Sequence, residues 1–346
     1  MNDPFDLLRI HPSEDGAAPG ASVGGSDSEI LDSAVHAVGE ELVLSASGPH
    51  GDGGDSGSGA GRSRLALLVS WAGHTDAGAL NEQLSTALLD ALPHKRLASF
   101  DADVLFDYRS RRPHISFAEN RFTEYSGPQL ELYEVKDALG QPFLLLTGDE
   151  PDFQWGRVTD TVLALVERLD VGLVVLVDAL GLPTPHTRPM GVTAHGNRKD
   201  LIDGISTWGP NAQIEAGLGQ VLEMRVDESG HDVVGYTLHV PHYVAGGRYP
   251  TVAVTALEYT GAALERMLPT DELRENARAV DQDIARQIGQ NPEVEALVKQ
   301  LEKNFDEHAS TAQRSLLVNR DEEVPDAEEL GAAVEAYLRS RPTQED

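Results

Sequence analysis

The sequence contains no cysteine. This absence excludes a disulfide framework, thiolate zinc sites, iron–sulfur clusters and a cysteine nucleophile. No apolar run approaches the ~20 residues that a bilayer-spanning helix needs. The first residues, MNDPFDLLRIHPSEDG, also lack the basic start and apolar stretch of a signal peptide. We therefore expect a cytoplasmic protein that does not enter a membrane.

Basic residues are also scarce. The chain has 27 Lys and Arg residues against 57 Asp and Glu residues, which gives a formal net charge of −30. A surface this acidic repels phosphate groups, so we expect no nucleic-acid partner. A chain of 346 residues can bury roughly 70–75% of its unfolded surface, so its folding requires neither disulfides nor a metal.

The composition changes along the chain. The first 61 residues carry eleven acidic residues and one basic residue, and they end in a Gly/Ser/Asp-rich stretch that cannot bury enough apolar surface to fold. We interpret 1–61 as an acidic, partly disordered extension. A core domain over 62–268, a helical region over 269–341 and a short tail over 342–346 are expected to follow.

Strand-like and helix-like segments alternate from residue 64 onward. The apolar run RLALLVSW (64–71) predicts a strand buried on both faces, and leucines four residues apart predict a helix over 76–92. Similar patterns predict strands over 95–101, 142–148, 171–180, 190–196 and 233–243, helices over 155–170, 213–226 and 252–268, and hairpin or meander strands over 114–119 and 130–137. This alternation predicts an α/β fold with a mixed sheet flanked by helices.

Two more helices are expected near the C-terminus. Thr270 can cap the first of them, and the pair Asn291-Pro292 has the form of a helix start. The second helix then shows an apolar stripe that includes Val294, Leu301 and Phe305. We expect a helical hairpin that packs against the sheet or against another subunit.

Polar residues follow several of the predicted strands. Asp76 in WAGHTDAG and Glu150 and Trp155 in GDEPDFQW each lie between a strand and a helix. Such acids could bind a ligand, but they could equally cap a helix or oppose its dipole. WAGHTDAG is neither a G-x-G-x-x-G motif nor a P-loop, so it does not support nucleotide binding.

Histidine and arginine follow the later strands. His186 and Arg188 lie in the proline-rich loop PTPHTRP, and His195 ends the next strand. His242 and Tyr243 end the strand that contains HVPHY. Open α/β sheets bind ligands at the carboxyl ends of their strands, so these residues are candidate pocket residues together with Asp76, Glu150 and Trp155.

We expect no metal and no cofactor. His239 and His242 are three residues apart, which places them on opposite faces of a strand, and no H-E-x-x-H motif is present. The basic segment DYRSRRP holds Arg109, Arg111 and Arg112. These side chains could bind an anion, but in so acidic a protein we favour salt bridges between subunits.

Seven short motifs resemble, in order, those of the bacterial branch of the proteasome assembly chaperone 2 family. They are WAGHTDAG, FDADVLFDYRSRRP, LLLTGDEPDFQW, PTPHTRP, VTAHGN, GPNAQIEAGL and VPHYVAGGRYP. The resemblance covers about residues 64–320. It implies a three-layer α/β/α domain similar to nucleoside phosphorylases and related hydrolases. The chain ends in RPTQED and departs from the hydrophobic-tyrosine ending with which eukaryotic members are thought to dock on the proteasome.

Two hypotheses for the function follow. Because eukaryotic and archaeal relatives act as chaperones or activators of the proteasome core, the resemblance implies a protein-interaction or assembly-chaperone-like protein. We expect such a protein to form a homo-oligomer, with a trimer favoured, to bind a protein partner such as proteasome subunits, and not to be an enzyme. The alternative is a small-molecule binder, or an enzyme like nucleoside phosphorylases or hydrolases, with a pocket at the strand ends.

Overall fold

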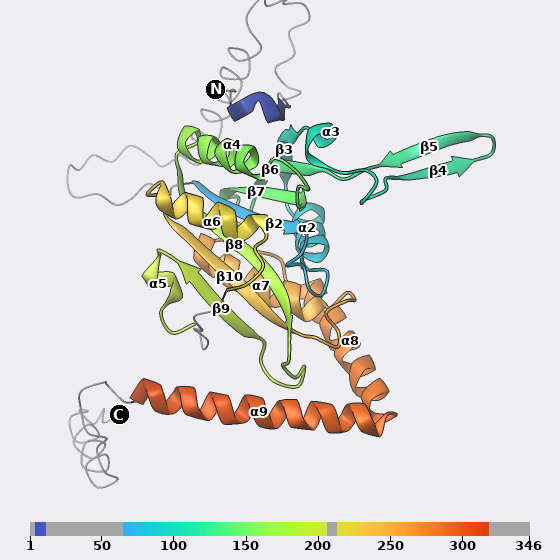
Figure 1. Cartoon of the computed structure of the whole chain (residues 1–346), viewed down its shortest axis with the longest axis vertical. Helices are drawn as coiled ribbons and strands as arrows, with labels where there is room; N and C mark the ends of the chain where they lie inside the picture. Colours follow the sequence, from blue (N-terminus) through green and yellow to red (C-terminus); the bar gives the residue numbers. More distant parts are fainter. Residues whose placement is uncertain (1–3, 12–64, 206–212, 318–346) are drawn as a thin grey trace, which may run out of the picture.

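The centre of the protein is an eight-stranded sheet with the order β1-β3-β6-β7-β2-β8-β10-β9, shown in Figure 1. The computed structural model describes residues 4–11, 65–205 and 213–317. The strands of this sheet are β1 (Leu8–Ile10), β2 (Leu65–Ala72), β3 (His94–Phe100), β6 (Leu130–Lys136), β7 (Pro142–Asp149), β8 (Val171–Leu182), β9 (Gly191–Gly196) and β10 (Val233–Pro241). The four inner strands β7, β2, β8 and β10 are parallel, and the outer pairings are antiparallel.

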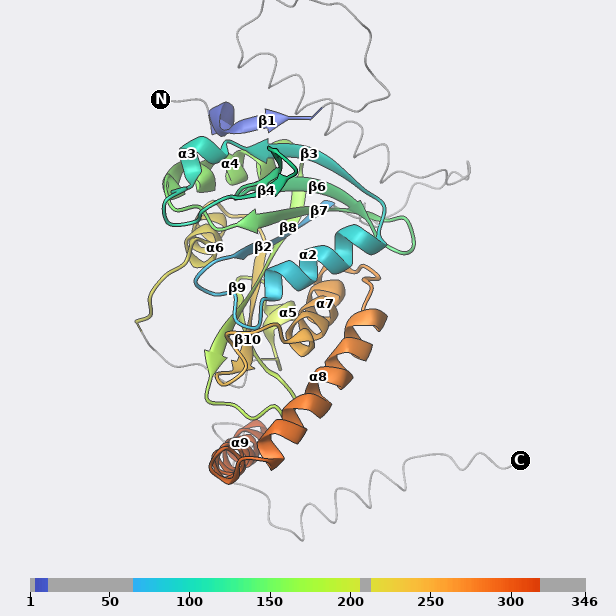
Figure 2. The same ribbon diagram turned by 90° about the vertical axis from the view of Figure 1, so that its right-hand side faces the viewer.

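Helices cover both faces of the sheet (Figures 1 and 2). The helical segments in the described ranges are η1 (Pro4–Leu7), α2 (Leu80–Ala91), α3 (Ala102–Leu105), α4 (Trp155–Arg168), α5 (Lys199–Ile202), α6 (Leu218–Glu228), α7 (Pro250–Leu264), α8 (Asp271–Gly289) and α9 (Pro292–Leu317). η1, α4 and α6 pack on one face, and α2, α7 and α8 pack on the other. The predicted α/β fold with a mixed central sheet between two helical layers is therefore confirmed.

The apolar runs of the inner strands explain this layering. Along β2, Leu67 and Val69 point into the core beneath α4 and α6, whereas Leu68 points into the core beneath α2 and α7. All three side chains are almost fully buried, and each contributes about 1.5–3 kcal/mol of burial free energy. A strand that is apolar on both faces can only lie between two layers.

The N-terminus differs from its prediction. Residues 4–10 form η1 and β1, and β1 pairs antiparallel with β3 at the edge of the sheet. Phe5, Leu7 and Leu8 are buried in the core, so this short segment belongs to the sheet and not to the acidic extension. η1 and β1 together span only seven residues, and acidic residues surround them in the sequence, so the sequence pattern did not reveal this short apolar segment. The expected Gly/Ser tract of the extension falls outside the described residues.

The two predicted C-terminal helices, α8 and α9, are present, but they meet at a sharp angle and do not form the expected antiparallel hairpin (Figures 1 and 2). In Figures 1 and 2, α9 turns sharply away from the end of α8 and runs across the lower end of the sheet. Val298 and Leu301 on α9 are buried, whereas Val294 and Phe305 are half-buried and Leu297 is exposed, so the expected apolar stripe is only partly covered. The end of the helical region and the tail over 342–346 lie beyond the described residues, and the domain boundaries remain predictions.

One further pair of strands leaves the body of the protein. β4 (His114–Ala118) and β5 (Arg121–Ser126) pair only with each other, and Figure 1 shows them projecting away from the sheet. The sequence patterns predict a strand over 114–119 but not this partner. Across the described ranges, no helix is both long enough and apolar enough to cross a membrane.

Candidate functional site

Most of the predicted pocket residues follow the carboxyl ends of the parallel strands, but His195 does not. β9 is antiparallel to β10, which places His195 opposite Gly235, near the start of β10. The strands β2, β7, β8 and β10 are parallel, so their carboxyl ends meet at one edge of the sheet. However, β8 continues six residues past Leu176, whereas β2 continues only three residues past Val69, its partner in the register. The difference of three residues is about 10 Å of extended chain. The loops after β8 and β10 therefore lie farther out than those after β2 and β7.

Asp76 lies in the loop before helix α2 and binds the first turn of that helix. Its Oδ1 accepts a hydrogen bond of 2.7 Å from the backbone N–H of Asn81, in the first turn of that helix. The helix begins at Leu80 after a left-handed residue, so Asp76 caps it from four positions before its start. Burial raises the pKa of Asp76 to about 6, although the hydrogen bond from Asn81 acts in the opposite direction.

Glu150 directly follows β7 and binds the start of helix α6. Its buried carboxylate accepts hydrogen bonds from the N–H of Leu218 at 2.6 Å and from the N–H of His74 at 3.2 Å. Leu218 is the first residue of α6, which explains why this helix starts there and not at 213 as the sequence pattern predicts. Trp155 begins α4, and its ring Nε1 donates to the carbonyl oxygen of Pro151.

His195 also contacts α6. Its Nδ1 lies 2.7 Å from Oε2 of Glu223, and its Nε2 lies 3.0 Å from Oγ1 of Thr237 on β10. Burial by itself would lower the pKa of His195. The hydrogen bond and charge of Glu223, together with the charge of Asp178, outweigh burial and raise this pKa.

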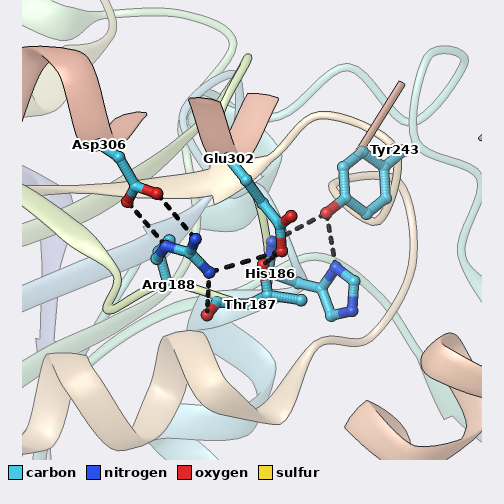
Figure 3. Close-up of polar contacts among 6 residues, drawn as sticks. All are labelled: His186, Thr187, Arg188, Tyr243, Glu302 and Asp306. Carbon is cyan, nitrogen blue, oxygen red and sulfur yellow. Dashed lines mark hydrogen bonds and ion pairs between the residues drawn. The ribbon is translucent and has the colours of Figure 1, made fainter. Parts of the chain in front are cut away.

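The loop after β8 is fastened to helix α9, as Figure 3 shows. Arg188 donates two hydrogen bonds of 2.8 Å to the carboxylate of Asp306 and lies 3.4 Å from Glu302. Thr187 donates a further hydrogen bond to Glu302. The hydrogen bond to Asp306 raises the pKa of Arg188, so this guanidinium remains charged. A two-bond Arg–carboxylate pair fixes both position and orientation.

His186 and Tyr243 join the same loop to the end of β10. The hydroxyl of Tyr243 lies 2.7 Å from Nδ1 of His186 and accepts a hydrogen bond of 2.8 Å from its backbone N–H (Figure 3). Burial lowers the pKa of His186, although the charges of Asp281 and Glu302 act in the opposite direction. The neighbouring His242 is exposed and stacks edge-on against Tyr243.

The predicted pocket residues thus form separate groups, and most of them fasten a helix to the sheet. Asp76 holds α2, Glu150 and His195 hold α6, and Arg188 holds α9. The strand-end pocket itself remains a prediction.

One of these groups has the order of a catalytic triad. Glu223, His195 and Thr237 are linked in series by hydrogen bonds, as an acid, a base and a hydroxyl would be. Thr237, however, lies in the middle of β10, with β8 on one side and β9 on the other. The backbone N–H groups there serve the sheet, so no oxyanion-binding donors face the hydroxyl. Nor do the described ranges contain a group of three or more His, Asp or Glu side chains that could hold a metal ion.

The three arginines after α3 have different roles. Arg111 is partly buried and lies 3.3 Å from Asp149 and 3.6 Å from Asp152, so it serves its own chain. Arg109 and Arg112 are exposed at the base of the β4–β5 hairpin. The sequence patterns predicted the first strand of this hairpin and missed the second, β5, although the alternation in RFTEYS is a signal for a strand.

The order of the strands and loops matches one family of proteins. The PAC2 family matches residues 70–288, which is more than half of the chain. The chain belongs to the PAC2 family. Most of the described sheet and the loops that carry Asp76, Glu150, Arg188 and Tyr243 lie within the matched residues. The seven motifs of the sequence therefore identified the family correctly.

Several solved structures share this fold. A Mycobacterium tuberculosis protein of unknown function is 36% identical, with 73% of this chain and 86% of that chain covered and a TM-score of 0.69. A Corynebacterium glutamicum protein of unknown function is 34% identical, with coverage of 76% and 96% and a TM-score of 0.69. The proteasome-assembly chaperone homologue of Mycobacterium tuberculosis is 23% identical, with coverage of 68% and 100% and a TM-score of 0.62. No curated protein matches the chain.

Proposed function

We propose that this PAC2 protein is an assembly-chaperone-like interaction protein that forms a homo-oligomer and binds a protein partner. Membership of the PAC2 family supports this role, because a member with the same fold is known as a proteasome-assembly chaperone homologue. Proteasome subunits are therefore the first candidate partner. The predicted pocket residues also support an interaction protein, because most of their hydrogen bonds attach helices to the sheet.

The observation that carries the proposal is the β4–β5 hairpin. Four apolar side chains on it are exposed: Ile115 by 52%, Phe117 by 64%, Phe122 by 68% and Tyr125 by 64%. Phe117 and Phe122 are paired in the register, and their ring centroids are 5.1 Å apart. An isolated two-stranded hairpin is at best marginally stable in water, so an apolar face of this kind requires a partner.

A second copy of the chain is the partner that we propose for the hairpin. The exposed Arg109 and Arg112 flank its base, and each copy offers a strongly acidic surface to which these arginines can pair. Arg111 takes no part, because it pairs with Asp149 and Asp152 of its own chain. A trimer is the assembly that we favour. The assembled oligomer then presents the remaining surface to the protein partner.

The experiment for the partner is direct binding to purified proteasome core particles and to their unassembled subunits. The full-length protein should comigrate with one of these in sedimentation velocity runs. Bovine serum albumin, another acidic protein, serves as the control for non-specific attraction. Absence of a complex with both core particles and free subunits would remove the proteasome as partner.

A further inference from the structure

A polar patch interrupts the core beneath helix α6. On the face of the sheet that α4 and α6 cover, the inner strands carry apolar side chains such as Val69 and Leu176. Farther along the same face, β8, β10 and β9 carry Asp178, Thr237 and His195 instead. Burying polar and charged groups costs free energy, so this patch requires an explanation beyond packing.

The backbone is shaped to admit the patch. Gly235 on β10 lies directly opposite His195 in the register. A Cβ atom at Gly235 would overlap the His195 ring and Oε2 of Glu223. A Cβ atom at Gly191 would likewise overlap the ring of His239. Glycine at both positions leaves room for the two histidine rings, so the backbone of the sheet accommodates the polar patch.

Helix α6 closes over the patch with two polar contacts. Nε2 of Gln220 donates a 2.5 Å hydrogen bond to Oδ2 of Asp178, and Glu223 contacts Nδ1 of His195 at 2.7 Å. The other oxygen of Asp178, Oδ1, is buried and has no hydrogen-bond partner within the described residues. Asp178, Thr75 and Gln220 line a small cavity of about 20 Å³, which has room for one water molecule.

The charge in this patch depends on two protons. With Asp178 and His195 both protonated, the imidazolium and the Glu223 carboxylate balance each other. Loss of the Asp178 proton leaves one excess negative charge, and loss of the His195 proton leaves two. Uncompensated charge in a buried site is destabilising, and the chain already carries −30.

We propose that α6 is a pH-dependent clasp on the sheet, held most tightly when Asp178 and His195 are both protonated and loosened when they lose their protons. The groups that face the pair are Glu223 and Gln220 from α6, Thr237 from β10, and Thr75 from the loop after β2. His239, two residues past Thr237 on β10, contacts Thr193, and burial lowers its pKa and so favours its uncharged form. Of these groups only Glu223 carries charge, and its negative charge favours the protonated forms of both partners.

The direction of the pKa shifts agrees with this reading. Burial raises the pKa of Asp178, although hydrogen bonds from Thr237 and Thr75 act against it, and the Glu223 contact raises the pKa of His195 against burial. Each group therefore binds its proton more strongly when α6 is closed than when it is open. Closure gains from both protons at low pH and loses that gain as pH rises through the two folded-state pKa values.

Single cysteines can measure this opening, because the chain has no cysteine of its own. Val226→Cys places a thiol on the buried side of α6, where Val226 is fully buried. Met224→Cys, at an exposed position of the same helix, supplies the intrinsic alkylation rate at each pH. Val162→Cys is the matched control, because Val162 is equally buried on α4, in the same layer. The quantity measured is the iodoacetamide rate of each buried thiol divided by that of the Met224→Cys variant.

We expect the relative alkylation rate of the Val226→Cys variant to rise about tenfold from about pH 6 to about pH 9, because the closed form loses both protons as pH rises. The rate of the Val162→Cys variant should remain constant. Adding Asp178→Asn should reduce the rise, and adding both Asp178→Asn and His195→Gln should remove it. If Asp178→Asn impairs folding, His195→Gln alone must still reduce the rise. A rate that is independent of pH, a parallel rise at position 162, or an unchanged rise in the double background would overturn the proposal.

Discussion

At the scale of single residues, polar side chains near the strand ends attach helices to the sheet. Asp76, Glu150, His195 and Arg188 come from four different loops or strands, and each makes a specific hydrogen bond to a helix. The sequence drew attention to these residues because open α/β sheets bind ligands at the carboxyl ends of their strands. Sequence alone could not decide between a pocket and helix attachment, because the same carboxylate or guanidinium serves both.

Asp76 should limit stability at neutral pH. Its folded-state pKa of about 6 lies above the ordinary value of 3.8, so folding favours the protonated form. Asp76→Asn removes the cost of the buried charge and keeps an oxygen for the Asn81 N–H. Chemical unfolding should show a gain of about 3 kcal/mol above about pH 7. The gain should shrink as pH falls from about 6 and vanish below about 4, and a constant gain across this range would contradict the assignment.

Arg188 should hold α9 locally without supporting the whole fold. Arg188→Ala removes three contacts to Glu302 and Asp306, so amide hydrogen exchange in 292–317 should become several-fold faster. The control is Arg198→Ala, since Arg198 has nearly the same exposure (31% against 32%) but pairs with Asp200 and Asp232. Equal exchange rates of α9 in the two variants would show that the ion pairs do not fix this helix.

At the scale of elements, the β4–β5 hairpin is the clearest case of a segment that its own chain leaves incomplete. Phe117→Ser together with Phe122→Ser removes the largest part of its exposed apolar face. These side chains are exposed, so the melting temperature at low concentration should change little, whereas light scattering should show a smaller particle. Leu139→Ser, at another site with 68% exposure, should leave the particle size unchanged. An unchanged mass in the hairpin variant would remove the hairpin as the oligomer contact.

The elements also show what the sequence could predict. The run 64–71 was identified as a buried strand because it is apolar on both faces, and β2 occupies 65–72. The helix expected over 213–226 starts five residues later because Glu150, 68 positions earlier in the chain, binds the N–H of Leu218. The strand at Leu8–Ile10 was missed because its pairing with β3 joins residues about ninety positions apart. Local patterns predict elements, but contacts between distant residues fix their ends and their neighbours.

At the scale of the whole molecule, the excess of acidic residues opposes compact folding. A net charge of −30 produces repulsion that salt screens with a length of about 10 Å at 0.1 M. The melting temperature should therefore rise by a few degrees between about 0.02 M and about 0.5 M sodium chloride. Scanning calorimetry at constant pH would check this. A fall in melting temperature would mean that the favourable ion pairs of the folded protein outweigh the repulsion.

The pairing of β1 with β3 also affects how the protein can be shortened. A truncation chosen from composition would remove everything before residue 62, and the first eleven residues would be lost with the acidic extension. The hydrogen-bonding edge of β3 would then be open to other chains, and the pockets for Phe5 and Leu7 would be empty. Such a shortened protein should precipitate, and a synthetic peptide that spans residues 1–12 should keep it in solution.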